Sequence, residues 1–224
     1  MLTPKAEAYL EECRQEAVDL LIRLAQIPAP SNQEEKRAVF CREWLEKNGA
    51  QGVYVDEALN VIYPVIKDGE PLEKQQLAVY AAHTDVVFPD LTPLPLTVEG
   101  NLICCPGVGD DTACLTALLI AARFVARELR QGSLKLKNEG VLFVCNSGEE
   151  GLGNLKGSRE ICRAFGKQMK EFITLDGPMD KLVTRAVGSM RYQVEIRTRG
   201  GHSYGDFGQP NAIARMAELI AKLY

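Results

Sequence analysis

The fold of this 224-residue chain is decided by residues 77–85, LAVYAAHTD, a continuous apolar run that ends in His83 and Asp85. An unbroken apolar run of this length predicts a strand that is buried on both faces, as in an α/β sheet. Two further apolar runs, at 141–146 and 172–175, predict two more buried strands. We therefore expect the chain to fold around a sheet whose central strands are covered by helices.

Acidic side chains follow these predicted strands. Glu149 and Glu150 come after the second run, and Asp176 comes after the third. A fourth acidic turn, with Asp110 and Asp111, opens a predicted helix. Because loops at the carboxyl ends of strands form sites at one edge of an open sheet, we expect these side chains to converge with the histidine turn. Such a cluster of carboxylates would repel itself without a cation, and its ligand types suit zinc, with cobalt or manganese as alternatives.

Shorter patterns predict the elements around this sheet. Apolar residues at helical spacing predict helices at 4–27, 111–129 and 158–165, and a further helix that begins after Ser31 and ends at Gly49. The pair Ser31 and Glu34 predicts a capping box at the start of the second helix. Strands are expected at 52–55 and 61–66, and a hairpin at 99–101. Together these elements predict an α/β fold with a mixed β-sheet flanked by helices.

The pattern changes after the third apolar run. Residues 189–198 alternate polar and apolar positions, which is typical of an antiparallel strand with one solvated face. Residues 212–223 have the spacing of an amphipathic helix. We therefore predict a domain boundary near residues 181–186, between a metal-binding domain at 1–183 and a second domain at 184–224.

The composition excludes several classes of protein. The chain is 46% hydrophobic and 25% charged, as in ordinary globular proteins, which excludes disordered and fibrous classes. A net charge of −4 gives no support to nucleic-acid binding, and no apolar run is long enough to span a membrane. Seven cysteines without a CxxC pair, and without a secretory segment before them, indicate a reducing, cytoplasmic setting.

Each acidic turn also has an ordinary explanation when it is considered alone. His83 and Asp85 would suit a hydrogen-bonded strand end, and Asp110 and Asp111 would suit a helix cap. The glycines of 107–109 raise the alternative of a nucleotide-binding oxidoreductase, but the third glycine of that motif is absent. The metal-site hypothesis therefore depends on the occurrence of four such turns in one chain.

The motifs together resemble family M20 of metallopeptidases, which comprises co-catalytic zinc exopeptidases and related amidohydrolases. The segments that carry the resemblance are AVYAAHTDVV (78–87), PGVGDDTACLTALL (106–119), VLFVCNSGEEGLGN (141–154), FITLDGP (172–178) and GGHSYGDFGQPNAI (200–213). The segments GGHSYGDFG (200–208) and HTDVVFPD (83–90) are similar to the peptidase branch that includes tripeptidase-like enzymes. The resemblance implies a zinc-exopeptidase-like sheet domain, followed by the start of a small α+β lid and dimerisation domain.

The resemblance also implies a ligand set for two divalent metal ions. His83, Asp110 and Asp176 would bind one ion. Asp110 would bridge to a second ion that Glu150 also binds, and the peptide bond after Asp110 would be cis. Members of the family continue beyond this length, so we expect the chain to be an N-terminal portion whose second metal site lacks a later histidine.

Three further residues receive roles from the same resemblance. Glu149 would be the general base and later the acid, acting on a metal-bridged water. Asp85 would orient His83 through its other ring nitrogen. His202, in the lid, would hold the carbonyl or oxyanion of the substrate.

The expected activity is metal-dependent hydrolysis of a peptide or amide bond, with short peptides or N-acyl amino acids as substrates and a homodimer formed through the lid. The alternative is a non-catalytic relative that binds peptides or serves as a scaffold.

Overall fold

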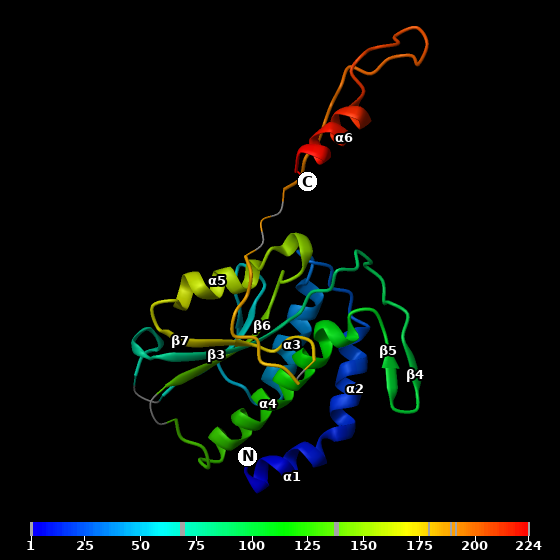
Figure 1. The fold of residues 1–224 in the computed structure, drawn as a ribbon. Coiled ribbons are helices and arrows are strands. Elements are labelled where there is room, and N and C mark those ends of the chain that lie inside the picture. Colours follow the sequence, from blue (N-terminus) through cyan, green and yellow to red (C-terminus); the bar gives the residue numbers. More distant parts are fainter. Residues whose placement is uncertain are drawn as a thin grey trace. The chain divides into compact units, whose positions relative to one another are not determined.

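The computed structural model describes residues 2–67, 70–136, 139–178, 180–188, 190 and 192–223. The chain divides into two compact units, residues 1–181 and 182–224, which Figure 1 draws as ribbons. The division falls two residues before the predicted domain boundary. The functions that we predict for the two domains stay predictions.

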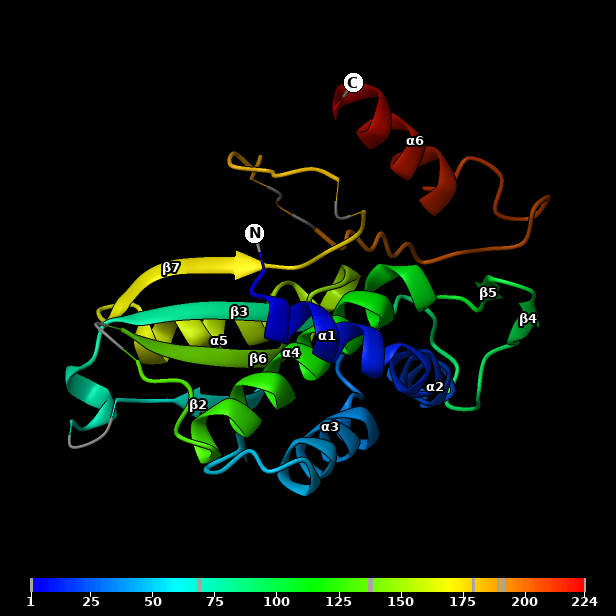
Figure 2. The same ribbon diagram turned by 90° about the horizontal axis from the view of Figure 1, so that it is seen from below.

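The first unit is built on a mixed sheet in which the described strands have the order β1-β2-β6-β3-β7. The strands are β1 (Tyr54–Val55), β2 (Val61–Val65), β3 (Leu77–His83), β6 (Gly140–Asn146) and β7 (Met169–Thr174). β3 is parallel to β6 and to β7, and Figure 2 shows these three strands side by side. β2 is antiparallel to β1 and to β6. The predicted α/β fold with a mixed sheet flanked by helices is confirmed.

Helices account for most of the remaining regular structure in the first unit. They are α1 (Pro4–Glu12), α2 (Arg14–Ala25), α3 (Glu35–Lys47), α4 (Ala113–Arg130) and α5 (Lys156–Phe165). The helix predicted at 4–27 is two helices, because the backbone leaves helical geometry at Cys13 (φ −95°, ψ 7°). The predicted hairpin is present as β4 (Thr97–Glu99) and β5 (Leu102–Cys104). Short helical turns lie at Leu72–Lys74 and Gly151–Gly153, whereas Val108–Thr112 is a turn in which Asp110 and Asp111 have non-helical φ and ψ angles.

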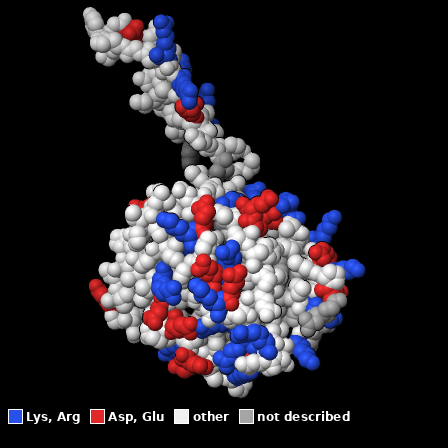
Figure 3. Space-filling view, turned by 180° about the vertical axis from the view of Figure 1, so that it is seen from behind, with Lys and Arg blue, Asp and Glu red and all other residues white. Residues whose placement is uncertain are grey.

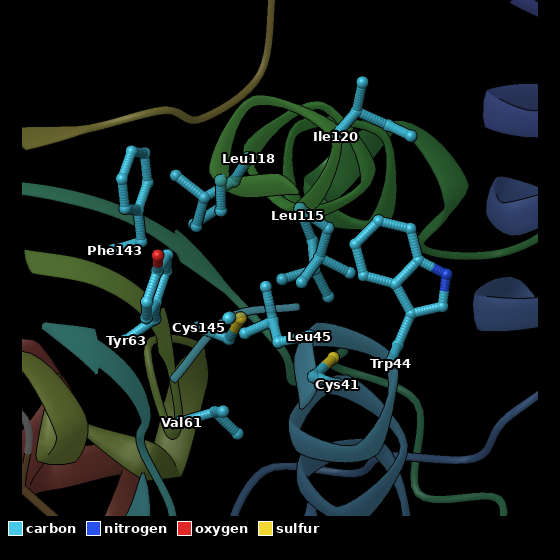
Figure 4. Packing of buried hydrophobic residues seen from close by; sticks show 14 of the residues in the cluster. Cys41, Trp44, Leu45, Val61, Tyr63, Leu115, Leu118, Ile120, Phe143 and Cys145 are labelled. Carbon is cyan, nitrogen blue, oxygen red and sulfur yellow. The ribbon is translucent and has the colours of Figure 1, made fainter. Parts of the chain in front are cut away.

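The core has two layers because successive side chains of a strand point to opposite faces of the sheet. On one face, Tyr63 of β2 and Cys145 of β6 pack with Leu115 of α4 in a cluster that includes residues of α1 to α4 (Figure 4). On the other face, Leu142 and Val144 of β6 pack against α5. Burial on both faces explains why the central strands are continuous apolar runs.

The third predicted strand differs from the expectation. β7 was expected to be buried, but its residues are half-buried or exposed. β7 forms the edge of the described sheet and pairs only with β3 there, so its side chains have fewer neighbours than those of β3 and β6.

The second unit contains α6 (Ala212–Leu223), which has the bounds that the sequence predicts, and α6 has no buried residue. The strand expected at 189–198 is not found at residue 190 or 192–198, while Ser189 and Arg191 lie outside the described residues. A strand needs a partner for its backbone N–H and C=O groups, and the described part of this unit offers none.

Two surface features bear on the classes of partner. Among the described residues, no helix combines the length and the apolar character needed to cross a membrane. Lys and Arg side chains are interspersed with Asp and Glu over the face of the first unit that Figure 3 shows. That face therefore has no extended region of a single charge sign.

Candidate metal centre

The candidate site lies where three parallel strands end. β3 ends at His83, which is opposite Asn146 at the end of β6. The turn after β6 carries Glu149 and Glu150, and Asp176 follows the end of β7. Because β3 lies between β6 and β7, His83 is flanked by an acidic turn on each side.

Two groups of potential ligands share His83. One group is His83, Asp110 and Asp176, and the other is His83, Glu149 and Glu150. Within each group, one ligand atom from each residue lies within 4.8 Å of the others. Glu150 thus lies in the group with His83 and Glu149, and its sharing of a second ion with Asp110 stays a prediction. Imidazole nitrogen and carboxylate oxygen at this spacing are donors that suit a divalent ion such as zinc, cobalt or manganese, so the donor set fits a metal.

His83 is 1% exposed and is held at its backbone and at both ring nitrogens. Its backbone N–H donates to Asp111 Oδ2 at 3.0 Å, and Nδ1 lies 3.0 Å from the carbonyl oxygen of Asp85. Nε2 lies 3.1 Å from Asp110 Oδ1. A carbonyl oxygen only accepts, so the Nδ1 contact requires the proton on Nδ1. Nε2 and the Asp110 carboxylate oxygen then need a proton or a metal ion between them.

The electrostatics of the cluster favour a bound cation. Burial by itself lowers the pKa of His83, but the hydrogen bond to Asp85 and the charges of Asp111 and other carboxylates outweigh burial and raise this pKa to about 10. Burial, reinforced by neighbouring carboxylates such as Asp176, raises the pKa of Glu149. A proton on His83 and a metal ion at Nε2 therefore compete for one position.

The loop before α4 exposes Asp110 and buries Asp111. The Asp110 side chain is 64% exposed, whereas Asp111 is 0% exposed and burial raises its pKa to about 7. The peptide bond between these two residues is cis, as the resemblance implies. Gly107 enters the loop at φ 75°, and a Cβ there would lie 2.5 Å from Val86 Cγ1, so the backbone path requires glycine.

Asp85 contacts the ring of His83 mainly through its backbone. The carboxylate Oδ1 is 3.5 Å from His83 Nδ1, farther than the carbonyl oxygen. The carboxylate has closer partners in the hydroxyl of Ser31 (2.7 Å) and the N–H groups of Glu149 (2.9 Å) and Glu150 (3.1 Å). Asp85 thus fixes His83 and also the backbone of the turn that carries Glu149 and Glu150, called the glutamate turn below.

The predicted capping box at Ser31 and Glu34 is wrong. α3 begins at Glu35 with Glu34 as its N-cap residue, and the Glu34 side chain makes no capping hydrogen bond. The Ser31 hydroxyl is engaged with Asp85, and the Glu34 carboxylate accepts the N–H of Gly148. The spacing of this serine and glutamate is typical of a helix cap. In the folded chain, the two side chains instead contact Asp85 and Gly148 next to the site.

His202 belongs to the second unit, and the first unit forms its cluster without it. The residue is exposed in the loop before α6. Its backbone N–H donates to Asp206 Oδ2 at 2.8 Å, and its Nδ1 accepts the N–H groups of Tyr204 and Gly205, both at 3.2 Å. These bonds leave Nε2 as the ring nitrogen available to a ligand. The role in substrate binding stays a prediction.

A comparison with known families gives the cluster a context. The family model described as Peptidase family M28 matches residues 60–197, more than half of the chain. The chain belongs to peptidase family M28. The match includes β2, β3, β6 and β7 and every residue of the cluster around His83.

Individual relatives are longer than this chain. A Pyrococcus abyssi protein named as a LysW-lysine/LysW-ornithine hydrolase is 31% identical over 152 residues, which are 68% of this chain and 38% of that protein. The chain therefore spans about 38% of the length of this curated relative.

Three solved structures are similar in fold. The dipeptidase Dug1p of Saccharomyces cerevisiae has a TM-score of 0.55 at 17% identity and covers 75% of this chain and 40% of its own. The aminopeptidase LapA of Legionella pneumophila has a TM-score of 0.54 at 18% identity, with 79% and 47% covered. The aminopeptidase PepT of Bacillus cereus has a TM-score of 0.52 at 19% identity, with 73% and 43% covered. These likenesses show a shared fold.

Proposed function

We propose that this chain carries the metal centre of a peptidase that hydrolyses peptide or amide bonds in short peptides. The observation that carries this proposal is the pair of ligand groups that share His83 at the ends of three parallel strands. Membership of family M28 supports hydrolysis of peptide bonds. The names of the relatives, which are aminopeptidases, a dipeptidase and a LysW-lysine hydrolase, support small substrates.

The motifs support a narrower proposal. Their resemblance to family M20 favours an exopeptidase of the tripeptidase-like kind, with short peptides or N-acyl amino acids as substrates. In this proposal His83, Asp110 and Asp176 hold one divalent ion, and Asp110 and Glu150 hold a second. Zinc is the proposed metal, with cobalt or manganese as alternatives. A divalent ion bound there supplies a Lewis acid that polarises a carbonyl oxygen and acidifies water.

Glu149 is the proposed proton acceptor and donor. Burial and the neighbouring carboxylates raise its pKa, which brings the carboxylate closer to a group that exchanges protons near neutral pH. Its backbone N–H is anchored to Asp85 Oδ1, and one of its carboxylate oxygens lies within 4.8 Å of a ring nitrogen of His83. Glu149 can therefore hold a proton within the cluster while its backbone stays fixed.

The second unit is proposed to be part of a lid and dimerisation domain. α6 exposes Ile213 (80%), Ile220 (50%) and Leu223 (73%), and an apolar face of this kind suits contact with another protein surface. His202 is proposed to bind the oxyanion of the substrate. Size measurement of the full chain by light scattering tests the homodimer, which predicts twice the mass of one chain.

The test of the main proposal combines metal analysis with peptide hydrolysis. The full chain is freed of metal, reloaded with zinc, cobalt or manganese, and incubated with a panel of di- and tripeptides and N-acyl amino acids. Asp110→Ala should lose bound metal. Glu149→Gln should keep metal and fold but lose hydrolysis, whereas Glu171→Gln, at an exposed carboxylate on β7, should change neither.

Each outcome decides between the hypotheses. Bound metal together with hydrolysis that depends on Glu149 supports the peptidase. Peptide binding without hydrolysis supports the non-catalytic alternative. A fully active Glu149→Gln variant, or unchanged metal content in Asp110→Ala, contradicts the roles assigned to these residues.

A further inference from the structure

The turn that carries Glu149 and Glu150 is held by two buried carboxylates from other parts of the chain. The N–H of Gly148 donates to Glu34 Oε1 at 2.9 Å. The next two N–H groups, of Glu149 and Glu150, donate to the two carboxylate oxygens of Asp85 at 2.9 and 3.1 Å. Three successive backbone donors thus end on two side chains, and one of these, Glu34, has no role in the metal centre proposed above.

Glu34 is buried completely, with 0% of its surface exposed. Burial of a carboxylate is unfavourable unless hydrogen bonds and charges compensate for lost water. The partners of Glu34 are the N–H of Gly148, the N–H of Asn32 at 2.8 Å and the Lys156 ammonium at 3.4 Å. Two of these three partners, Gly148 and Lys156, flank the glutamate turn in sequence, so the compensation for burial comes largely from that turn.

The segment that contains Glu34 also contacts Asp85. Ser31 donates its hydroxyl to Asp85 Oδ2 at 2.7 Å. The N–H of Val86 donates to the carbonyl of Ala29 at 2.9 Å, and Pro30 forms a parallel bridge with Val86. Residues 29–34 therefore lie beside the end of β3. This arrangement brings the carboxylates of Glu34 and Asp85 against the turn after β6.

Other hydrogen bonds hold the residues on either side of Gly148, such as that from the Ser147 N–H to Asn60 Oδ1 at 3.1 Å, so the contribution of Glu34 is specific to Gly148. Gly148 has φ 57°, a conformation that favours glycine. A Cβ on the facing Gly153 would lie 2.5 Å from Gly148 Cα, so the backbone segments at these two residues can approach each other only with glycine at 153. The carbonyl of Gly148 accepts the N–H of Lys156 at 3.0 Å, which fixes the opposite side of the same residue. The N–H of Gly148 reaches only Glu34 among the described hydrogen bonds.

We propose that Glu34 is a positioning residue: its buried carboxylate, together with Asp85, fixes the backbone from which Glu149 and Glu150 reach the cluster around His83. The proposal rests on the proposed function only for the importance of Glu149 and Glu150. The anchoring of the turn is a property of the folded chain and can be measured without metal or substrate.

The first measurement is hydrogen exchange of the metal-free full chain, resolved for the peptide that covers 147–155. Glu34→Ala should speed exchange there about tenfold or more, because a hydrogen bond to a charged acceptor is lost. Exchange in β3 and α4 should stay unchanged. Glu35→Ala, at the exposed neighbouring position, is the matched control and should match the unsubstituted chain in every segment.

Two further variants distinguish the length of the Glu34 side chain from its negative charge. Glu34→Gln retains an oxygen acceptor at the same distance and should restore most of the protection of 147–155. Glu34→Asp keeps the charge but is one methylene shorter, so it should expose the turn to exchange. If Glu34→Ala does not fold, Glu34→Asp decides: faster exchange confined to 147–155 supports the proposal, and exchange equal to that of the unsubstituted chain overturns it.

The second measurement is zinc binding by calorimetry. Glu34→Ala should weaken the affinity about tenfold, Glu34→Gln should restore it, and Glu35→Ala should have no effect. Equal affinity for zinc and equal exchange of 147–155 in Glu34→Ala and the unsubstituted chain would overturn the positioning role. A chain that binds no zinc at all contradicts the proposed function instead, and the exchange measurement still decides the role of Glu34.

Discussion

Binding of a divalent metal to this chain should release protons, and the affinity should rise with pH. The pKa of His83 is raised to about 10 in the metal-free cluster, so at pH 7 the protonated ring outnumbers the neutral ring by roughly a thousand to one. A metal ion binds only neutral imidazole, so each ion bound at His83 displaces about one proton. Raising the pH removes this competitor, and the affinity should increase about tenfold per pH unit between pH 7 and 9.

The assay is isothermal titration calorimetry of zinc into the metal-free chain at pH 6.5, 7.5 and 8.5. Each titration is repeated in two buffers with different heats of ionisation, and the difference in measured heat gives the number of protons released. The chain has two histidines, which supply a matched pair of variants: His83→Gln should abolish the pH-dependent binding, and His202→Gln should leave it unchanged.

Two results would refute this reasoning. One is an affinity for zinc that does not change between pH 6.5 and 8.5. The other is proton release that is the same in His83→Gln as in the unsubstituted chain. Either result would mean that the ring of His83 is not the group for which proton and metal compete.

Three further predictions concern the scaffold of the site. Arg37 is 2% exposed and its guanidinium donates to three backbone carbonyls, including that of Thr84 at 2.8 Å. Arg37→Met removes these donors and should lower the free energy of unfolding, measured with urea, by at least about 1–3 kcal/mol. Gly107→Ala, at φ 75° and against Val86, should weaken zinc affinity in calorimetry because it displaces the loop of Asp110; unchanged affinity would contradict this. Leu115→Ala, at 0% exposure, should cost about 2–5 kcal/mol in the same urea assay, whereas Val39→Ala on the surface of α3 should change stability by less than about 0.5 kcal/mol.

Much of the fold could be predicted from local sequence. The runs at 77–82 and 141–146 predicted β3 and β6 because a strand covered on both faces needs apolar residues at every position. The helix at 212–223 could be predicted because its apolar residues recur at helical spacing. These features depend on residues that are close together in the chain.

The errors occurred where distant contacts outweigh a local pattern. β7 has an apolar sequence at 172–175 but lies at the edge of the described sheet, and nothing in those residues specifies that place. Ser31 and Glu34 have the spacing of a capping box, but buried partners in the turns after β3 and β6 take both side chains. A local pattern cannot show which of two partners a polar side chain will bind.

The sequence by itself determined which residue types are available to the site: an imidazole and several carboxylates, each placed at the end of a predicted strand or the start of a helix. Tertiary structure alone decided that β3 lies between β6 and β7, and this order makes His83 common to both ligand groups. It also decided that Glu34 anchors Gly148, 114 positions along the chain. The physical reason is that strand order and buried hydrogen bonds join residues that are far apart in sequence. These contacts stabilise the chain only after the intervening loops have closed, so no local pattern specifies them.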